Sequence, residues 1–196
     1  MPHPRRNPPI YLGIDSSSAY LALALWSLEG VLGCFCEEVG REHAARVGVE
    51  LERLFARADV RRSDLAGVGV GTGPGSYTGL RVGVATAKGV AQGLGVPLSG
   101  ESSLAAMAAA RLTPDEPKGV VALDARRGNV YAGVFERIEG EAGHEEIRYG
   151  DIEKVSRDEL QARHPTLPYF ENVAPDAAYL ARCAATGVGS ATPLYL

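Results

Sequence analysis

Residues 65–81 read LAGVGVGTGPGSYTGLR, the most distinctive segment of the chain. Its first part is apolar with glycine at alternate positions, which predicts a short strand over Leu65–Val70. Its second part is a glycine-rich turn that leads into a predicted helix over Tyr77–Leu94. The turn matches neither the G-x-G-x-x-G pattern nor a P-loop, because no Gly-Lys-Ser/Thr follows it. Such a turn either binds an anion at the helix N-terminus or allows close backbone packing, and without a phosphate-binding lysine we favour packing.

The helix after this turn carries a stripe of small residues spaced four apart, Gly79, Gly83, Ala87 and Ala91. A glycine inside a helix costs roughly 1 kcal/mol relative to alanine, so two of them on one stripe indicate that another backbone lies very close. That backbone belongs either to an internal sheet or to another protein. The neighbouring stripes are largely apolar, which predicts burial on more than one side and favours a protein interface. They consist of Tyr77, Leu80, Val84, Lys88 and Leu94.

Upstream of the turn, three apolar runs separated by tight turns predict a β-meander. These runs are Ile10–Ile14, Ala19–Trp26 and Val31–Glu38. A helix is predicted over Glu42–Ala58, because apolar side chains recur there at spacings of three and four. Its apolar face consists of His43, Val47, Leu51, Leu54 and Ala58. Downstream of the turn we predict a strand over Pro97–Gly100 and a helix over Ser102–Arg111 that begins at a serine cap.

A stretch rich in proline and charge, residues 113–119, marks a predicted boundary between two lobes. The elements expected beyond it are strands over Val120–Leu123 and Val130–Phe135, a charged hairpin around Glu139–Tyr149, and helices near Ser156–Arg163 and Pro175–Ala185. Each half starts with an apolar strand that ends in an aspartate, Asp15 or Asp124, followed by a turn and a second strand. This weak self-similarity indicates either a duplicated architecture or chance agreement between two hairpins.

The composition is that of a globular protein and not of a disordered chain. Of the 196 residues, 45% are hydrophobic and 22% are charged, which is enough apolar surface to build a core. The formal net charge of −4 argues against a stand-alone nucleic-acid-binding protein, which usually has a basic face. Three cysteines without a signal peptide favour a reducing, cytoplasmic environment. Residues 1–9 form a predicted disordered tail, and the longest apolar run, Tyr20–Leu25, is far too short to span a membrane.

Three motifs together resemble the TsaB family, also called YeaZ. They are IDSS at residues 14–17, GPGSYTGLR at residues 73–81 and GVATAKG at residues 83–89. The resemblance is strongest over residues 10–112, and the chain is somewhat short at its C-terminal end compared with the family. It implies an α/β fold of the actin-like or Hsp70-like class, with two lobes built on ribonuclease-H-like mixed sheets flanked by helices. The expected lobes span residues 10–112 and 118–196.

The same resemblance implies a function. TsaB proteins are non-catalytic paralogues of the catalytic subunit TsaD, and they act with TsaD and the ATPase TsaE to make N6-threonylcarbamoyladenosine at position 37 of tRNAs. Their first two helices form a bundle with TsaD or with another TsaB, and here these are the helices that begin at Glu42 and Tyr77. The partner-binding residues predicted from this resemblance are His43, Val47, Leu51, Leu54, Tyr77, Leu80, Gly83, Val84, Ala87 and Lys88.

No catalytic or metal-binding residue is predicted. TsaD carries a pair of metal-binding histidines on one helix, whereas the histidines of this chain are scattered, and a lone histidine cannot form a metal site. They are His3, His43, His144 and His164. We expect His43 to be solvated or at an interface. Asp15, Ser16 and Ser17 are weak candidates for nucleotide binding, although an aspartate at such a position more often caps the turn. We expect no tightly bound cofactor, with ATP and Mg²⁺ only in the assembled complex.

Two other hypotheses belong to different classes. A nucleotide-dependent phosphotransferase of the actin-like class would need Asp15 and Asp124 to face each other across the cleft. A metalloprotease has no support, because no H-E-x-x-H motif occurs. Basic pairs are confined to Arg5-Arg6, Arg61-Arg62 and Arg126-Arg127, so we expect tRNA to be bound through the partner and not directly.

Overall fold

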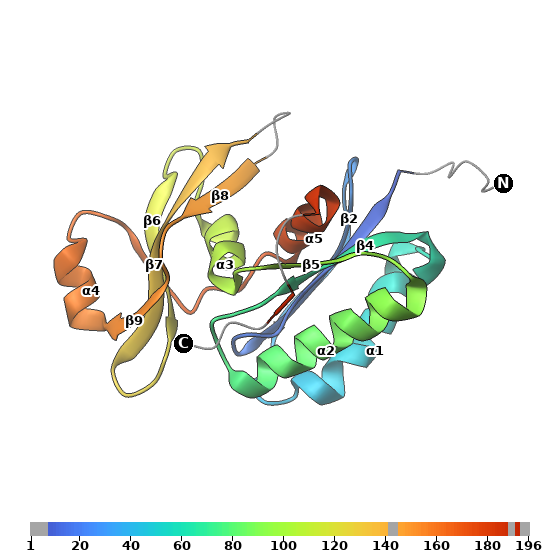
Figure 1. Cartoon of the computed structure of the whole chain (residues 1–196), viewed down its shortest axis with the longest axis horizontal. Coiled ribbons are helices and arrows are strands. Elements are labelled where there is room, and N and C mark those ends of the chain that lie inside the picture. Colours follow the sequence, from blue (N-terminus) through green and yellow to red (C-terminus); the bar gives the residue numbers. More distant parts are fainter. Residues whose placement is uncertain (1–7, 141–144, 188–190, 193–196) are drawn as a thin grey trace.

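The structure is a computed structural model that describes residues 8–140, 145–187 and 191–192. Most of the predicted disordered tail, residues 1–7, and residues 141–144 of the predicted charged hairpin lie outside the described residues. Two five-stranded sheets form the framework, and helices lie outside and between them (Figure 1). This arrangement confirms the predicted two-lobed architecture of mixed sheets flanked by helices.

The first sheet has the strand order β3-β2-β1-β4-β5. Its antiparallel half is the predicted meander of β1 (Ile10–Asp15), β2 (Tyr20–Ser27) and β3 (Gly30–Glu38). β4 (Leu65–Gly71) then pairs parallel with β1, and β5 (Leu98–Glu101) pairs parallel with β4. Because parallel neighbours need a crossover, the chain makes a helix before each of these two strands. The result is a ribonuclease-H-like sheet, as predicted.

The two crossover helices, α1 (His43–Ala58) and α2 (Tyr77–Leu94), cover the same face of this sheet (Figure 1). They bury their apolar faces against side chains such as Leu12, Ile14 and Val70. Ser76 caps α2, because its hydroxyl accepts a hydrogen bond from the Gly79 N–H at 3.3 Å. A single 3₁₀ turn, η1 (Arg62–Asp64), leads from α1 into β4.

The second sheet has the order β10-β6-β7-β8, and β9 also pairs with β7. Its strands are β6 (Lys118–Asp124), β7 (Asn129–Glu139), β8 (Glu145–Tyr149), β9 (Glu153–Ser156) and β10 (Tyr169–Glu171). The short helix α4 (Arg157–Arg163) covers its outer face, where Leu160 packs against Val120, Ala122 and Val130.

Two helices lie between the sheets, α3 (Ser103–Arg111) and α5 (Ala177–Thr186). α3 packs against β6, β7 and β8, although its sequence precedes the predicted lobe boundary. α5 packs against β1, β2 and β4, although its sequence lies in the second half. Each sheet is therefore covered on its inner face by a helix from the other half of the chain. The sequence pattern shows only that these helices are apolar, and it does not show which sheet each one covers.

Candidate functional site

Most of the side chains predicted to bind a partner lie in the chain's own core. The buried ones are His43, Val47, Leu51, Leu54, Leu80, Gly83, Val84 and Ala87. Of the predicted set, only Tyr77, which is 59% exposed, and Lys88 remain at the surface. This corrects the prediction, because a side chain packed against the chain's own sheet is not available to a partner. The apolar faces of α1 and α2 belong to the core, as is usual for amphipathic crossover helices.

The small-residue stripe that begins at Gly79 has an internal cause. A Cβ atom on Gly79 would lie 2.1 Å from the carbonyl oxygen of Ser16, and one on Gly83 would lie 2.3 Å from Ser16 Oγ. Ser16 Oγ also donates a hydrogen bond to the Gly79 carbonyl at 2.8 Å. The stripe therefore lets the β1–β2 turn approach the backbone of α2, and it does not face another protein.

A second row of small residues on α2 faces outward. Ala85, Gly89 and Gly93 are spaced four apart and are all exposed. A Cβ atom on Gly89 or Gly93 would meet nothing within 4 Å, and the same holds for Gly48 on α1. The cost of these helical glycines, roughly 1 kcal/mol each, is therefore not explained by packing within the chain. We call Ala85, Gly89 and Gly93 the outer row. Its polar neighbours Arg81, Lys88 and Gln92 were the sequence signal that could have identified it as the surface.

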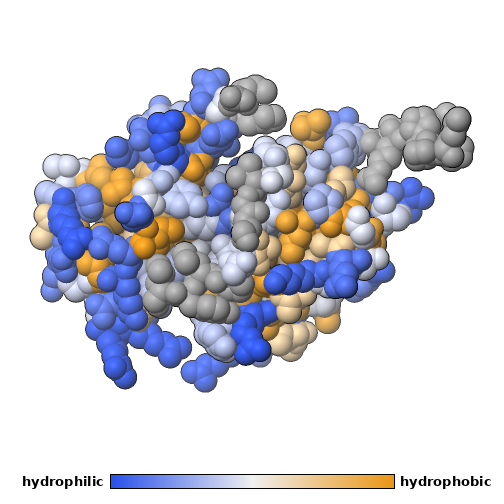
Figure 2. Space-filling model, in the orientation of Figure 1, coloured by the Kyte–Doolittle hydropathy of each residue, from blue (hydrophilic) through white to orange (hydrophobic). Residues whose placement is uncertain are grey.

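The exposed surface of α1, which packs beside α2, is also partly apolar. Val49 of α1 is 47% exposed, and Ala44, Ala45 and Ala56 on the same helix are exposed as well. Figure 2 shows apolar residues among the charged ones over the part of the molecule that α1 and α2 form. Single exposed apolar residues need no explanation, but their occurrence together with uncovered helical glycines makes this face the best candidate for docking.

His43 is neither solvated nor free for an interface. It is the first residue of α1 and is 5% exposed. Its Nε2 atom lies 3.1 Å from the carbonyl oxygen of Tyr20. His43 therefore links the start of α1 to β2, which corrects the expectation of a surface histidine.

The candidate nucleotide loop, Asp15 to Ser17, is closed over by the turn before α2. Asp15, Ser16 and Ser17 are at most 2% exposed. The Ser76 N–H donates to the Ser17 carbonyl at 2.7 Å, and a Cβ atom on Gly75 would lie 2.2 Å from the same oxygen. Asp15 Oδ1 accepts hydrogen bonds from the Ser17 N–H and hydroxyl, both at 2.8 Å. This is the turn-capping role that we favoured for Asp15, and it leaves no access for a phosphate group.

The other carboxylate oxygen of Asp15 is buried without a hydrogen-bond partner among the described residues. It occupies the space beside Gly71, where a Cβ atom would lie 1.8 Å from Oδ2. Burial raises the pKa of Asp15, and this effect outweighs the nearby Ser103 hydroxyl, the hydrogen bonds from Ser17 and the charge of His43, which lower it. The negative charge of ionised Asp15 therefore destabilises the folded chain.

Replacing Asp15 by asparagine is expected to stabilise the chain at pH 7 by about 1–3 kcal/mol, because the neutral amide avoids the cost of burying a negative charge. A carboxyl whose pKa is raised by folding favours the folded state below its unfolded pKa, and this advantage is lost as the pH rises through the folded pKa. The gain from Asp15→Asn should therefore shrink as the pH falls toward 4. Urea unfolding at pH 4, 5.5 and 7 measures this, and lower stability of the variant at pH 7 would show that the ionised carboxylate is stabilised by the fold.

Asp124 does not complete a two-aspartate site. Its carboxylate is paired with Arg157 Nη2 at 2.9 Å, and its N–H donates to Asn172 Oδ1 at 3.0 Å. Arg157 in turn binds both carboxylate oxygens of Glu171. With Asp15 enclosed and Asp124 held in this network, the geometry does not provide the pair of free carboxylates that the phosphotransferase hypothesis needs.

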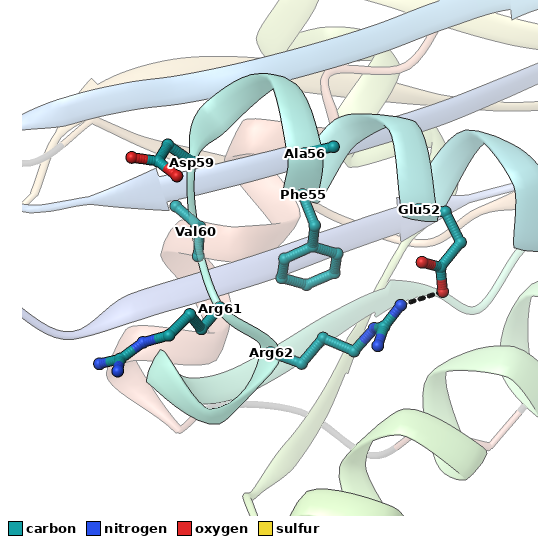
Figure 3. A pocket seen from close by; sticks show the side chains of 7 residues that line it. All are labelled: Glu52, Phe55, Ala56, Asp59, Val60, Arg61 and Arg62. Atoms are coloured by element: carbon teal, nitrogen blue, oxygen red, sulfur yellow. Dashed lines mark ion pairs between the residues drawn. The ribbon is translucent and has the colours of Figure 1, made fainter.

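A pocket of about 400 Å³ lies at the C-terminal end of α1, beside the candidate docking face (Figure 3). It is lined by Glu52, Phe55, Ala56, Asp59, Val60, Arg61 and Arg62. Phe55 is buried and supplies an apolar wall, while the rim carries an ion pair between Arg62 and Glu52. Exposed ion pairs of this kind contribute little to stability. The pocket contains no cysteine, serine or histidine that could act as a nucleophile or base.

Comparison with known proteins decides the family. The family model described as "TsaD: tRNA N6-adenosine threonylcarbamoyltransferase" matches residues 27–185. The TsaB protein of Bacillus subtilis (strain 168), named for tRNA threonylcarbamoyladenosine biosynthesis, is 36% identical over 131 residues, which cover 66% of this chain and 56% of the relative. TsaB of Escherichia coli (strain K12) is 32% identical over 136 residues, which cover 69% and 58%. The solved structure of YeaZ from Pseudomonas aeruginosa matches with a TM-score of 0.79 and 25% identity, covering 96% of this chain and all of that one.

The chain belongs to the TsaB (YeaZ) family.

The match to these TsaB relatives covers somewhat more than half of their length, 56% and 58% in the two cases above. His3 and His144 lie outside the described residues. Within the described ranges, no three His, Cys, Asp or Glu side chains of this TsaB-family chain are grouped closely enough to hold a metal ion. No helix in the part of the chain that the structure describes is both long and apolar enough to cross a membrane.

Proposed function

We propose that this chain is a non-catalytic docking subunit of the assembly that makes N6-threonylcarbamoyladenosine in tRNA, and that it binds a TsaD-type catalytic subunit through the outer face of α1 and α2. Family membership supports the pathway, because the TsaB relatives are named for tRNA threonylcarbamoyladenosine biosynthesis. The observation that carries the docking role is the outer row, whose glycines face open space.

Small residues at spacings of four allow two helices to approach closely, so that backbone and side-chain atoms of the partner fill the groove. On α2 this groove is formed by Ala85, Gly89 and Gly93, and on α1 Gly48 and Val49 extend the same kind of surface. Packing of a partner helix against these glycines would offset the loss of helix stability that they cause in the free chain. A second copy of the chain could use the same face, so a homodimer and a heterodimer would compete for it.

Ala85→Glu is expected to abolish pairing with the TsaD-type subunit while leaving the fold intact. The new carboxylate would lie on the proposed docking face, where a bound partner would desolvate it, and an interface loss of at least about 2 kcal/mol corresponds to roughly thirtyfold weaker binding. Light scattering of the mixed, purified proteins measures the mass of the complex. The matched control is Ala185→Glu, the same substitution at an exposed position of α5 on the opposite side of the first sheet.

In cells depleted of the natural protein, the Ala185→Glu variant should restore threonylcarbamoyladenosine in digested tRNA, and the Ala85→Glu variant should not. If wild type forms no heterodimer, the docking role is wrong. If both variants pair equally well, the partner uses another surface. If the heterodimer forms but threonylcarbamoyladenosine in tRNA does not depend on it, the interaction is real and the proposed pathway is wrong.

The phosphotransferase hypothesis is not favoured by any contact at Asp15 or Asp124. Calorimetry with ATP and Mg²⁺ tests it directly, on the chain alone and on the heterodimer. Binding to the chain alone would revive it, whereas binding only to the heterodimer would agree with a nucleotide held by the partner or at the subunit boundary. The same purified samples allow a TsaE-type ATPase to be added as a third component.

A further inference from the structure

The turn between β6 and β7 holds two consecutive arginines in a strained backbone conformation. Arg126 and Arg127 have φ angles of 65° and 55°, in the left-handed region, and Gly128 follows with a φ of 78°. For residues other than glycine, asparagine or aspartate, this conformation costs of the order of 1 kcal/mol or more. Glycine or asparagine would form the turn with less strain, so the turn geometry alone does not account for arginine at both positions.

The structure around the turn holds this conformation firmly. The Arg126 N–H donates to Asp124 Oδ1 at 3.3 Å, and the Asn129 N–H donates to the Arg126 carbonyl at 3.1 Å. The Arg157 N–H donates to the Gly128 carbonyl at 3.3 Å, while its guanidinium binds Asp124 and Glu171. The hydrogen bonds of the turn use its backbone atoms, and the Arg157 ion pairs fix its flank, so the side chains of Arg126 and Arg127 take part in none of these contacts.

Both arginines are exposed, and among the described residues neither guanidinium has an ion pair or a hydrogen bond. The described part of the chain contains one other arginine pair, Arg61-Arg62, and there Arg61 is paired with Asp64 at 2.9 Å and Arg62 with Glu52. In a chain of net charge −4, the turn is therefore a site where two adjacent cations are displayed without neutralisation. Figure 1 shows this turn at the lower end of the second sheet, away from the α5 helix between the sheets.

We propose that Arg126 and Arg127 contact the phosphodiester backbone of tRNA in the assembled complex. Guanidinium groups bind phosphate oxygens with two parallel hydrogen bonds, and the held turn backbone keeps the two arginines side by side at the surface. The proposal rests on the proposed function for the presence of tRNA, and it replaces our expectation that tRNA is held only through the partner. Backbone contacts position the RNA without reading its sequence.

The test measures the affinity of the heterodimer for an unmodified tRNA transcript as a function of salt, by fluorescence anisotropy. The variant Arg126→Asn/Arg127→Asn removes both charges and keeps residues that tolerate the left-handed backbone, so the turn should remain folded. Each lost phosphate contact lowers the slope of log affinity against log salt by about one, so we expect a decrease of about two, with roughly tenfold weaker binding at 0.1 M salt. Its urea midpoint should rise, because strain is relieved.

The matched control is Arg61→Asn/Arg62→Asn, which makes the same charge change at the arginine pair that is already neutralised. An equal loss in both variants, or no loss in the turn variant, overturns the proposal. Loss of the heterodimer in the turn variant also overturns it, because the arginines would then contact an acidic protein surface. The mass of the wild-type complex is measured first. If no heterodimer forms, the proposed function fails, and the same titration on the chain alone still decides whether the turn binds RNA.

Discussion

Val84→Glu is expected to unfold the chain and not merely to release a partner. Val84 is 4% exposed and lies in the apolar core between α2 and the first sheet, with Leu12, Ile14 and Val70 in the same cluster. A carboxylate there would have no charge or hydrogen-bond donor opposite it. The expected loss is about 4–5 kcal/mol or more, a large part of the 5–15 kcal/mol that stabilises an ordinary domain. Circular dichroism and urea unfolding measure it directly.

The informative control for this variant is Ala85→Glu, one residue along the same helix. Ala85 is exposed, so its glutamate can remain solvated, and Arg81 lies one turn earlier on the helix surface. We expect its urea midpoint to stay close to that of wild type. A folded Val84→Glu protein with normal stability would show that this face of α2 does not pack on the sheet, and it would restore Leu80, Val84 and Ala87 as candidate partner-binding residues.

Gly69→Ala is expected to destabilise the chain by roughly 3–5 kcal/mol, above the usual range for added core methyl groups. A Cβ atom on Gly69 would lie 1.9 Å from the carbonyl oxygen of Leu180, and Gly13 on the next strand has the same relation to Ala177, at 1.8 Å. Both contacts are with the backbone of α5, which cannot rotate away as a side chain can. The helix would have to lift off the sheet and expose Leu180, which is fully buried.

Gly48→Ala, which adds the same methyl group, is expected to raise the stability of the chain. Gly48 lies within α1, and a Cβ atom there would meet nothing within 4 Å. We therefore expect a gain of about 1 kcal/mol, from helix propensity alone. In urea unfolding, the midpoint of Gly69→Ala should be lower than that of wild type and the midpoint of Gly48→Ala should be higher. If Gly69→Ala falls within 1 kcal/mol of wild type, α5 is not held against β1 and β4 as closely as described.

Part of the candidate site could be predicted from the sequence, and part of it could not. The motif at residues 73–81 identified the family, and the apolar periodicity of α1 and α2 identified the two helices at their observed positions. Whether the stripe that begins at Gly79 meets the chain's own fold or another protein was left open, and the favoured alternative, a protein interface, does not match its contacts. Two rows of small residues run along this helix, and glycine signals a close approach without saying what approaches. The structure places Ser16 beside the inner row and open space beside the outer row.

Local patterns were enough to predict most of the helices and strands in their order, because hydrogen bonding, caps and the periodicity of apolar residues depend on neighbours along the chain. The short strands β9 and β10 were not predicted. The meander, the strand-to-helix turn, the serine cap of α3 and the capping role of Asp15 follow from such local patterns. Three features needed the three-dimensional structure: α3 and α5 each cover the sheet of the other half, Asp15 is buried beside Gly71, and Arg126 and Arg127 have no ion pair among the described residues. These features depend on contacts between residues far apart in the sequence, and no local pattern records which of several apolar or charged groups will meet.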